Sequence, residues 1–350
     1  MTTTDMILSS LSSTPTRGPW SERSIEKSFP SGILVIDKPE GLTSFRVVDK
    51  VKKRLHLKKA GHCGTLDPFA TGVLVICLNQ ATHIADLFSC QEKAYQAVFR
   101  LGTETDTLDR TGQVTHNWDG PPFSRDEVRS ALDHFVGSYI QEVPCYAAVK
   151  VQGRRLYQWT REGVEVDRPS REIHIHAIGM LAYRWPEVTV AVKCSKGTYI
   201  RQIAADMGRL LGCGAHVSEL RRTESGQFRI DQALSLDEIV EPVKDNERIA
   251  WREKLISINE ALAHLPAVLV EDETVLRRLS DGHLDPGWES ENRERFEQQR
   301  DPVRIVSGAN QLLALWWPQP EAGRRRRLRL FDRDSSFNTQ TSIPCETKED

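Results

Sequence analysis

Residues 61–79 read GHCGTLDPFATGVLVICLN. They contain one acid, Asp67, between a Gly-Thr-Leu approach and a proline, with an apolar run behind it. An isolated Asp-Pro pair predicts the start of a helix, with Asp as the N-cap and Pro in the first turn. The glycines Gly61, Gly64 and Gly72 allow tight turns and the close approach of a ligand, which suits a carboxylate held out for chemistry. The stretch alone leaves both interpretations open.

The apolar run after Asp67 predicts a buried element, so this aspartate would lie at the edge of a core on rigid support. Aspartate is normally ionised at neutral pH, and an anionic carboxylate can act as a nucleophile or as a base. The spacing does not decide between these roles. His62 and Cys63 supply too few donors for a metal, so we expect no metal site here.

The next candidate is a tyrosine on a predicted strand. In AYQAVFRLG, apolar and polar residues alternate, and Tyr95 shares a face with Phe99 and Leu101. A tyrosine in such a place is most often a core aromatic. Its functional interpretation is a ring that stacks on an extruded base, with a hydroxyl able to relay a proton.

An arginine near a helix start is the third candidate. Alternation in EVTVAVKC predicts a strand, and the apolar spacing after KGTYIR predicts a helix from about Ile200 that ends at Gly212. Arg201 would then oppose the helix dipole. This local penalty indicates a carboxylate or phosphate partner elsewhere in the fold.

The segment before Asp67 is basic. GILVIDKP predicts a strand over 32–39, and Thr43 or Ser44 can cap a helix with a lysine-rich outer side. The net charge is only −2, but basic residues gather in 46–59, 150–161 and 324–329. Segregation of this kind fits an RNA-binding face, although a solvated helix face is the commoner explanation of any single cluster.

The chain of 350 residues is long enough for two domains, and its composition is that of a soluble globular protein. It has neither an apolar run long enough for a membrane span nor a secretory signal pattern. Seven scattered cysteines without a CxxC pair indicate reduced thiols and a cytoplasmic location. We expect disordered residues at 1–30 and 333–350, a first domain over 31–240 with an exposed arm at about 143–169, and a small β-rich domain over 255–332.

Five blocks in one order resemble the TruB family of tRNA pseudouridine synthases. They are GILVIDKPEGLTSFRVVDKVKK, AGHCGTLDPFATGVLVICLNQAT, KAYQAVFRLGTETDTLDRTGQV, YAAVKVQGRRLYQWTREGVEV and CSKGTYIRQIAADMGRLLGCGAHVSELRRT, which cover nearly all of 32–223. The resemblance implies the α+β pseudouridine synthase fold, with a mixed, largely antiparallel sheet. It implies that Asp67 is the catalytic residue, that Tyr95 stacks on the target base and assists proton removal, and that Arg201 pairs with Asp67.

The resemblance also implies the substrate and its contacts. The reaction breaks the glycosidic bond of a uridine and rejoins the uracil through carbon without a cofactor, at uridine 55 in the T-arm of tRNA. His62 would help to extrude that uridine. Further candidate RNA contacts are Lys38, Tyr199, Lys150, Arg154 and Arg155.

The arm and the C-terminal part depart from the family pattern. The family usually has Pro-Pro-x-Tyr-Ser-Ala where this chain has VPCYAA, with Val143 and Ala147 at the changed positions. The C-terminal part resembles a degenerate PUA-like RNA-binding domain, with RRRRLRL as a possible phosphate contact. We expect a monomer that needs no membrane and no obligate protein partner.

Three alternatives stay open. A guide-RNA-dependent synthase of the same family is one, although the retained arm favours a stand-alone tRNA enzyme. A non-catalytic tRNA-binding protein or folding chaperone is the second. A hydrolase of free nucleosides is the third, and it would lack basic RNA-facing arms. The sequence also leaves open whether Asp67 attacks the sugar, attacks the ring, or first takes a ribose proton.

Overall fold

The computed structural model describes residues 31–239, 250–319 and 327–331. They fall into two compact units, of which the first is Ser31–Ala261 and the second starts at Leu262. The first unit therefore extends past residue 240, where the sequence placed the end of the first domain. The terminal segments 1–30 and 333–350 and most of the RRRRLRL cluster lie outside the described residues.

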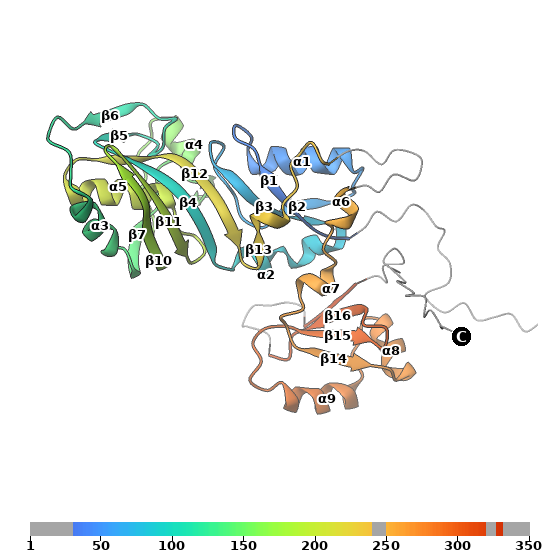
Figure 1. The fold of residues 1–350 in the computed structure, drawn as a ribbon. Helices are drawn as coiled ribbons and strands as arrows, with labels where there is room; N and C mark the ends of the chain where they lie inside the picture. Colours follow the sequence, from blue (N-terminus) through green and yellow to red (C-terminus); the bar gives the residue numbers. More distant parts are fainter. Residues whose placement is uncertain (1–30, 240–249, 320–326, 332–350) are drawn as a thin grey trace, which may run out of the picture. The chain divides into compact units, whose positions relative to one another are not determined.

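One nine-stranded sheet organises the first unit. Its main path runs β1-β3-β12-β4-β11-β10-β7, with β2 paired to β3 and β13 paired to β12 (Figure 1). All pairs are antiparallel except the short parallel pair of β12 and β3. The predicted α+β class with a mixed, largely antiparallel sheet is confirmed. The strands are β1 (Gly32–Lys38), β2 (Ala60–His62), β3 (Thr71–Leu78), β4 (Lys93–Leu101), β7 (Gly137–Glu142), β10 (Ser170–Arg184), β11 (Glu187–Cys194), β12 (Ala215–Ser225) and β13 (Phe228–Arg229).

Three helices pack on this sheet, and their ends follow local rules. Thr43 caps α1 (Ser44–Arg54) by accepting from the N–H of Arg46, and Val47, Val48 and Val51 of α1 are buried. Gly212 ends α5 (Ile200–Leu211) in a left-handed conformation with φ 77°. Helix α3 (Arg125–Asp133) begins with a Ser124 capping box and packs beside α5 and β10 (Figure 1). The shorter elements of this unit are β5 (Thr103–Thr105), β6 (Val114–Asn117), α2 (Ala85–Ser89), α6 (Ala250–Glu253), α7 (Ile258–Ala261) and the 3-10 turns η1 (Asn79–Ile84) and η2 (Ile230–Gln232).

The helix start predicted at Asp67 is wrong. The backbone makes one turn there, closed by the N–H of Ala70 donating to the carbonyl of Asp67 at 3.1 Å, and then enters strand β3. Pairing decides the outcome, because β3 is buried between β1 and β12 and its β-branched residues suit a strand. Gly72 permits the close crossing: its φ is +99°, and an added Cβ would lie 2.2 Å from the carbonyl oxygen of Arg222.

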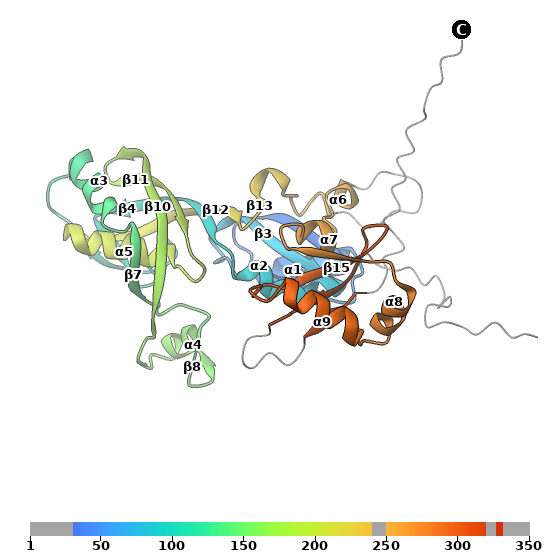
Figure 2. The ribbon, with the colours of Figure 1, turned by 90° about the horizontal axis from the view of Figure 1, so that it is seen from below.

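The predicted arm has its own small fold. It contains the hairpin of β8 (Lys150–Val151) and β9 (Arg154–Arg155), followed by α4 (Leu156–Arg161), and Figure 2 shows α4 and β8 standing away from β7 and β10. Val143, Ala147 and Leu156 form its apolar core. The two departures from the family pattern thus place apolar side chains inside the arm.

The second unit is built on a four-stranded sheet in the order β14-β15-β16-β17. A β sheet is thus present in the C-terminal part that the sequence predicts to be β-rich, whereas the PUA-like identity stays a prediction. Trp316 is the centre of the core and contacts Trp288 and Phe296. Among the described residues, no helix is long and apolar enough to cross a membrane. The elements are β14 (Ala267–Val270), α8 (Glu273–Ser280), α9 (Pro286–Arg295), β15 (Val303–Ser307), β16 (Leu312–Trp316) and β17 (Leu328–Leu330).

Candidate active site

The turn that carries Asp67 is fastened on its α1 side by Ser44. The Ser44 hydroxyl accepts from the N–H of Leu66 at 2.8 Å and donates to the Leu66 carbonyl at 3.1 Å. Ser44 is 2% exposed, so these bonds form away from water. The residue directly before Asp67 is therefore fixed to the first turn of a helix, and the carboxylate is presented from a rigid support.

Lys38 fastens the same turn from β1. Its ammonium donates to the carbonyls of Pro39 at 2.8 Å, Leu42 at 2.8 Å and Pro68 at 3.2 Å, which uses all three N–H donors. Burial lowers the pKa of Lys38 to about 8, against an opposing effect of the nearby Asp67 charge. The sequence suggested an RNA contact here, and that prediction is corrected: the side chain is fully buried and holds the backbone on both sides of the site.

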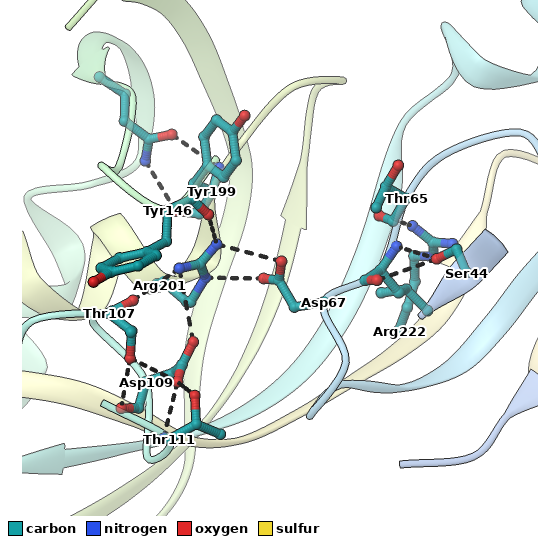
Figure 3. A network of polar contacts seen from close by, with 12 residues as sticks. Ser44, Thr65, Asp67, Thr107, Asp109, Thr111, Tyr146, Tyr199, Arg201 and Arg222 are labelled. Carbon is teal, nitrogen blue, oxygen red and sulfur yellow. Dashed lines mark hydrogen bonds and ion pairs between the residues drawn. The ribbon is translucent and has the colours of Figure 1, made fainter. Parts of the chain in front are cut away.

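Arg201 contacts Asp67 through two hydrogen bonds (Figure 3). Its Nε lies 2.9 Å from Oδ2 and its Nη2 lies 3.3 Å from Oδ1. The arginine side chain is 3% exposed, while that of Asp67 is 32% exposed. The partner carboxylate that the helix position of Arg201 predicted is thus present. This side-on pairing fixes the plane of the carboxylate and leaves it open to the cavity.

The other donors of Arg201 are also satisfied. Nη1 donates to the carbonyl of Thr107 at 2.8 Å, and Nη2 donates to the carbonyl of Tyr146 at 3.1 Å. A second carboxylate, that of Asp109, lies 3.7 Å from Nη1 and is 7% exposed. Arg201 therefore joins α5, the loop between β5 and β6, and the arm at one point.

Asp109 is a site residue that the sequence reasoning missed. Its Oδ1 accepts from Thr107 Oγ1 at 2.9 Å and from the N–H and hydroxyl of Thr111 at 2.9 and 2.5 Å (Figure 3). Its loop is joined to β12 through backbone bonds of Val217. The available signal was the threonine spacing in TDTLDRT, but that pattern is equally typical of an exposed turn.

Tyr95 lies on the inward face of β4, in line with Ala97, Phe99 and Leu101, as the alternation predicted. It lines a cavity of about 470 Å³ together with Asp67, Tyr199 and Arg201. Burial raises the pKa of the Tyr95 hydroxyl, and a hydrogen bond and the charge of Arg222 act in the opposite direction. The ring therefore stays neutral, and one cavity wall is an aromatic surface.

Arg222 is a second missed residue. Its side chain is 1% exposed and donates to the carbonyls of Val73 at 2.7 Å, Gly64 at 3.1 Å and Thr65 at 3.4 Å. It holds the approach to Asp67 from the β12 side, opposite Lys38. The signal in the sequence was its spacing. Arg222 stands two residues after Leu220 on one strand, so both side chains lie on the same, buried face.

Tyr199 lies at the N-cap of α5 and contacts the arm core. Gln141, a third missed residue, is 1% exposed and binds both sides of the Tyr199 backbone, accepting from its N–H at 2.8 Å and donating to its carbonyl at 3.1 Å. The guanidinium of Arg171 lies 5.4 Å from the Tyr199 ring centre. The clamp fixes the helix start that carries Arg201.

The remaining predicted RNA contacts are distributed over two places. On the arm, Lys150 is exposed, Arg154 pairs with Glu162 at 2.5 Å, and Arg155 lines the cavity. His62 ends β2 and does not line the cavity, and burial followed by the charge of Arg222 lowers its pKa. The structure thus brings Asp67, Tyr95, Arg201, Tyr199 and Arg155 together, and leaves His62, Lys150 and Arg154 outside the cavity.

This arrangement suits a reaction on a nucleobase that enters the cavity from outside. It offers a fixed anionic carboxylate, an aromatic wall and buried cations in a cavity of nucleoside size. The cations Arg201, Lys38 and Arg222 are each held by hydrogen bonds, so this part of the site is organised before a ligand arrives.

Comparison with known proteins gives a consistent result. Residues 52–200 match the TruB family pseudouridylate synthase (N terminal domain), and residues 201–263 match the tRNA pseudouridylate synthase B C-terminal domain. The chain is 53% identical to tRNA pseudouridine synthase B of Syntrophobacter fumaroxidans over 86% of its own length and 98% of that protein. It is 42% identical to tRNA pseudouridine synthase B of Syntrophus aciditrophicus, over 73% and 80%. The crystal structure of a Cbf5-Nop10-Gar1 complex contains a similar fold, with a TM-score of 0.61 and 25% identity over 89% of this chain and 87% of that one.

Proposed function

The chain belongs to the TruB family of pseudouridine synthases and forms pseudouridine in tRNA, and we propose that Asp67 is its catalytic residue and uridine 55 of the T-arm its target. The observation that supports this proposal most directly is the pairing of Asp67 with Arg201. The two residues are far apart in the sequence, yet they meet at 2.9 Å at the wall of a cavity of nucleoside size.

To enter this cavity, the target uridine must leave the base stack of the RNA. A uracil inside a folded T-loop is inaccessible to a carboxylate at the edge of a protein core, so the nucleotide must be extruded before it can react. The neutral ring of Tyr95 then provides a stacking surface for the base. The exposed Lys150 and the cavity-lining Arg155 support an arm that contacts the RNA backbone.

The same geometry serves both routes to cleavage of the glycosidic bond. Asp67 either adds to the sugar or the ring as a nucleophile, or takes a ribose proton as a base. In each case Arg201 holds the carboxylate in one orientation. Residues that hold the backbone, above all Lys38 and Arg222, preserve the position of the carboxylate during the reaction.

The enzyme works as a single chain on tRNA, in the cytoplasm, without a guide RNA. The identity to curated tRNA enzymes, 53% in one case, is far higher than the 25% identity to the chain from the Cbf5-Nop10-Gar1 complex. An unmodified tRNA transcript incubated with the purified chain should therefore acquire pseudouridine in its T-arm. Modification that appears only after a second RNA or protein is added would contradict this part of the proposal.

The catalytic assignment is tested by Asp67→Asn with the same transcript. The amide keeps the shape of the side chain but can neither attack nor accept a proton as the carboxylate does. We expect pseudouridine formation to fall at least about 10⁴-fold in single-turnover assays while tRNA binding changes little. Asp37→Asn is the matched control, because Asp37 pairs with Arg221 away from the cavity. Full activity of Asp67→Asn would refute the role of Asp67.

A further inference from the structure

Lys93 is a buried lysine that lines the cavity, and none of the roles described above belongs to it. It begins β4, is 6% exposed and lines the cavity beside Tyr95. Its Nζ donates to the carbonyl of Ser89 at 2.6 Å and to that of Gln91. An ammonium group has three N–H donors. Within the described part of the chain these two carbonyls hold two of them, so one donor remains for a group that enters the cavity.

The strand places this donor next to the aromatic wall. Lys93 and Tyr95 lie two residues apart on the same buried face of β4, a spacing of about 7 Å along the strand. A base stacked on the Tyr95 ring would therefore have its edge within reach of the lysine side chain. The cations Arg201 and Arg222 are already engaged with protein oxygens, so they offer less to that edge.

We propose that Lys93 donates a hydrogen bond to a carbonyl oxygen of the extruded uracil and stabilises the negative charge that the base acquires during the reaction. The inference rests on the proposed function. When the C1′–N1 bond breaks, its electron pair stays on the uracil and spreads over N1, O2 and O4. Addition of Asp67 to C6 of the ring likewise moves the electron pair of the C5–C6 double bond toward O4, which then carries negative charge. Lys93 keeps its proton in both cases. The charge on the base is lost when C5 bonds to C1′, and the isomerisation is completed when C5 loses its proton and N1 gains one.

The surroundings of Lys93 strengthen such an interaction. Burial lowers its pKa to about 8, and the charge of Arg222 acts in the same direction. The ammonium is thus still protonated at neutral pH but poorly solvated. A donor in such a place interacts more strongly with developing negative charge than one in water, and it needs no reorganisation.

The first test removes the ammonium. In single-turnover assays on a tRNA transcript, Lys93→Met should lower the rate of pseudouridine formation about 10- to 100-fold, while the Kd for tRNA changes less than about threefold. Lys93→Arg should recover part of the rate because it keeps a charged donor. Lys193→Met is the matched control: Lys193 lies on β11, is 53% exposed at its side chain, and pairs with Glu92 outside the cavity. A wild-type rate in Lys93→Met would overturn the proposal.

The second test changes the base and compares two substrates with the same enzyme, so a lower amount of folded Lys93→Met cancels in the comparison. Transcripts with 2-thiouridine or 4-thiouridine at the target position offer a weaker acceptor at one ring position. One of the two thio substitutions should slow the wild-type enzyme relative to the uridine transcript. In Lys93→Met, most of this difference in rate between the two transcripts should disappear. An undiminished thio effect in Lys93→Met, or equal losses in rate and binding as expected for a phosphate contact, would refute the inference. If the wild type formed no pseudouridine in the T-arm, the proposed function itself would fail.

Discussion

At the scale of single residues, the pair of Asp67 and Arg201 depends on a second carboxylate. Asp109 lies 3.7 Å from Nη1 of the arginine and is itself held by Thr107 and Thr111. The guanidinium of Arg201 is 3% exposed and needs a counter-charge, which the buried carboxylate of Asp109 can supply. With Asp67 alone, one carboxylate would have to serve both as the counter-charge of the arginine and as the reacting group. Asp109 thus positions Arg201 and, in the proposed function, leaves Asp67 free to act on the substrate.

Asp109→Asn should consequently impair turnover more than binding. The amide can still accept from the threonines but lacks the charge that faces Arg201. We expect the single-turnover rate to fall about 10- to 100-fold, with the Kd for tRNA within about threefold of the wild type. Asp106→Asn, on the same loop but exposed and bonded to Gln113, should change the rate less than about twofold. A loss of binding equal to the loss of rate would contradict a positioning role.

Lys38 predicts a dependence of stability on pH. Its pKa is about 8 in the folded chain and near the ordinary value of 10.5 when unfolded. Between these values the unfolded state binds more protons, so the contribution of Lys38 to the free energy of unfolding rises with pH, by up to about 1.4 kcal/mol per pH unit. Below pH 8 the buried charge is present in full. Urea unfolding from pH 7 to 9.5 should show that the free energy of unfolding of the wild type, relative to that of Lys38→Met, rises above pH 8. A relative free energy that stays constant with pH would contradict this.

At the scale of elements, regular periodicity was predictable and tertiary pairing was not. The alternation around Tyr95 and the helix that carries Arg201 follow from local pattern, and both are present. The turn at Asp67 has the residues of a helix start, yet pairing with the neighbouring strands draws residues 71–78 into the sheet. Asp109 and Arg222 contact site elements that are distant in the chain, so their local patterns, which are also typical of an exposed turn and an ordinary strand, could not by themselves identify them.

The arm is an element whose packing should control both its order and the site. Leu156 is 1% exposed in the arm core, and the arm supplies the Tyr146 carbonyl to Arg201. Leu156→Ala should remove about 2–3 kcal/mol of local packing. Trypsin should then cleave the arm at its lysine and arginine residues several-fold faster, and the KM for tRNA should rise. Leu279→Ala, which empties a similar site in the second unit, should leave the rate of arm cleavage unchanged. Equal cleavage of the arm in both variants would show that its core does not order it.

At the scale of the whole molecule, the site and the second unit have separate cores. Arg201, which bonds to Asp67, and the residues that line the cavity belong to Ser31–Ala261, whereas the core around Trp316 belongs to the second unit. The family match ends at residue 263, close to this boundary. We therefore expect the chemistry of the site to be separable from the stability of the second unit, and we propose that the second unit takes part in binding tRNA.

Trp316→Ala tests that division. The side chain is fully buried, with ring centres of Trp288 and Phe296 at 5.5 and 6.4 Å, and its loss should remove about 3–5 kcal/mol, enough to unfold a small unit. Calorimetry should show one melting transition lowered or lost. The rate at saturating tRNA should stay within about threefold of the wild type while KM rises about tenfold. Phe88→Ala, which empties the contact with Phe228 in the first unit, should instead lower the other transition. An unchanged KM in Trp316→Ala would show that the second unit takes no part in tRNA binding. A collapse of turnover would show that the active site depends on the second unit.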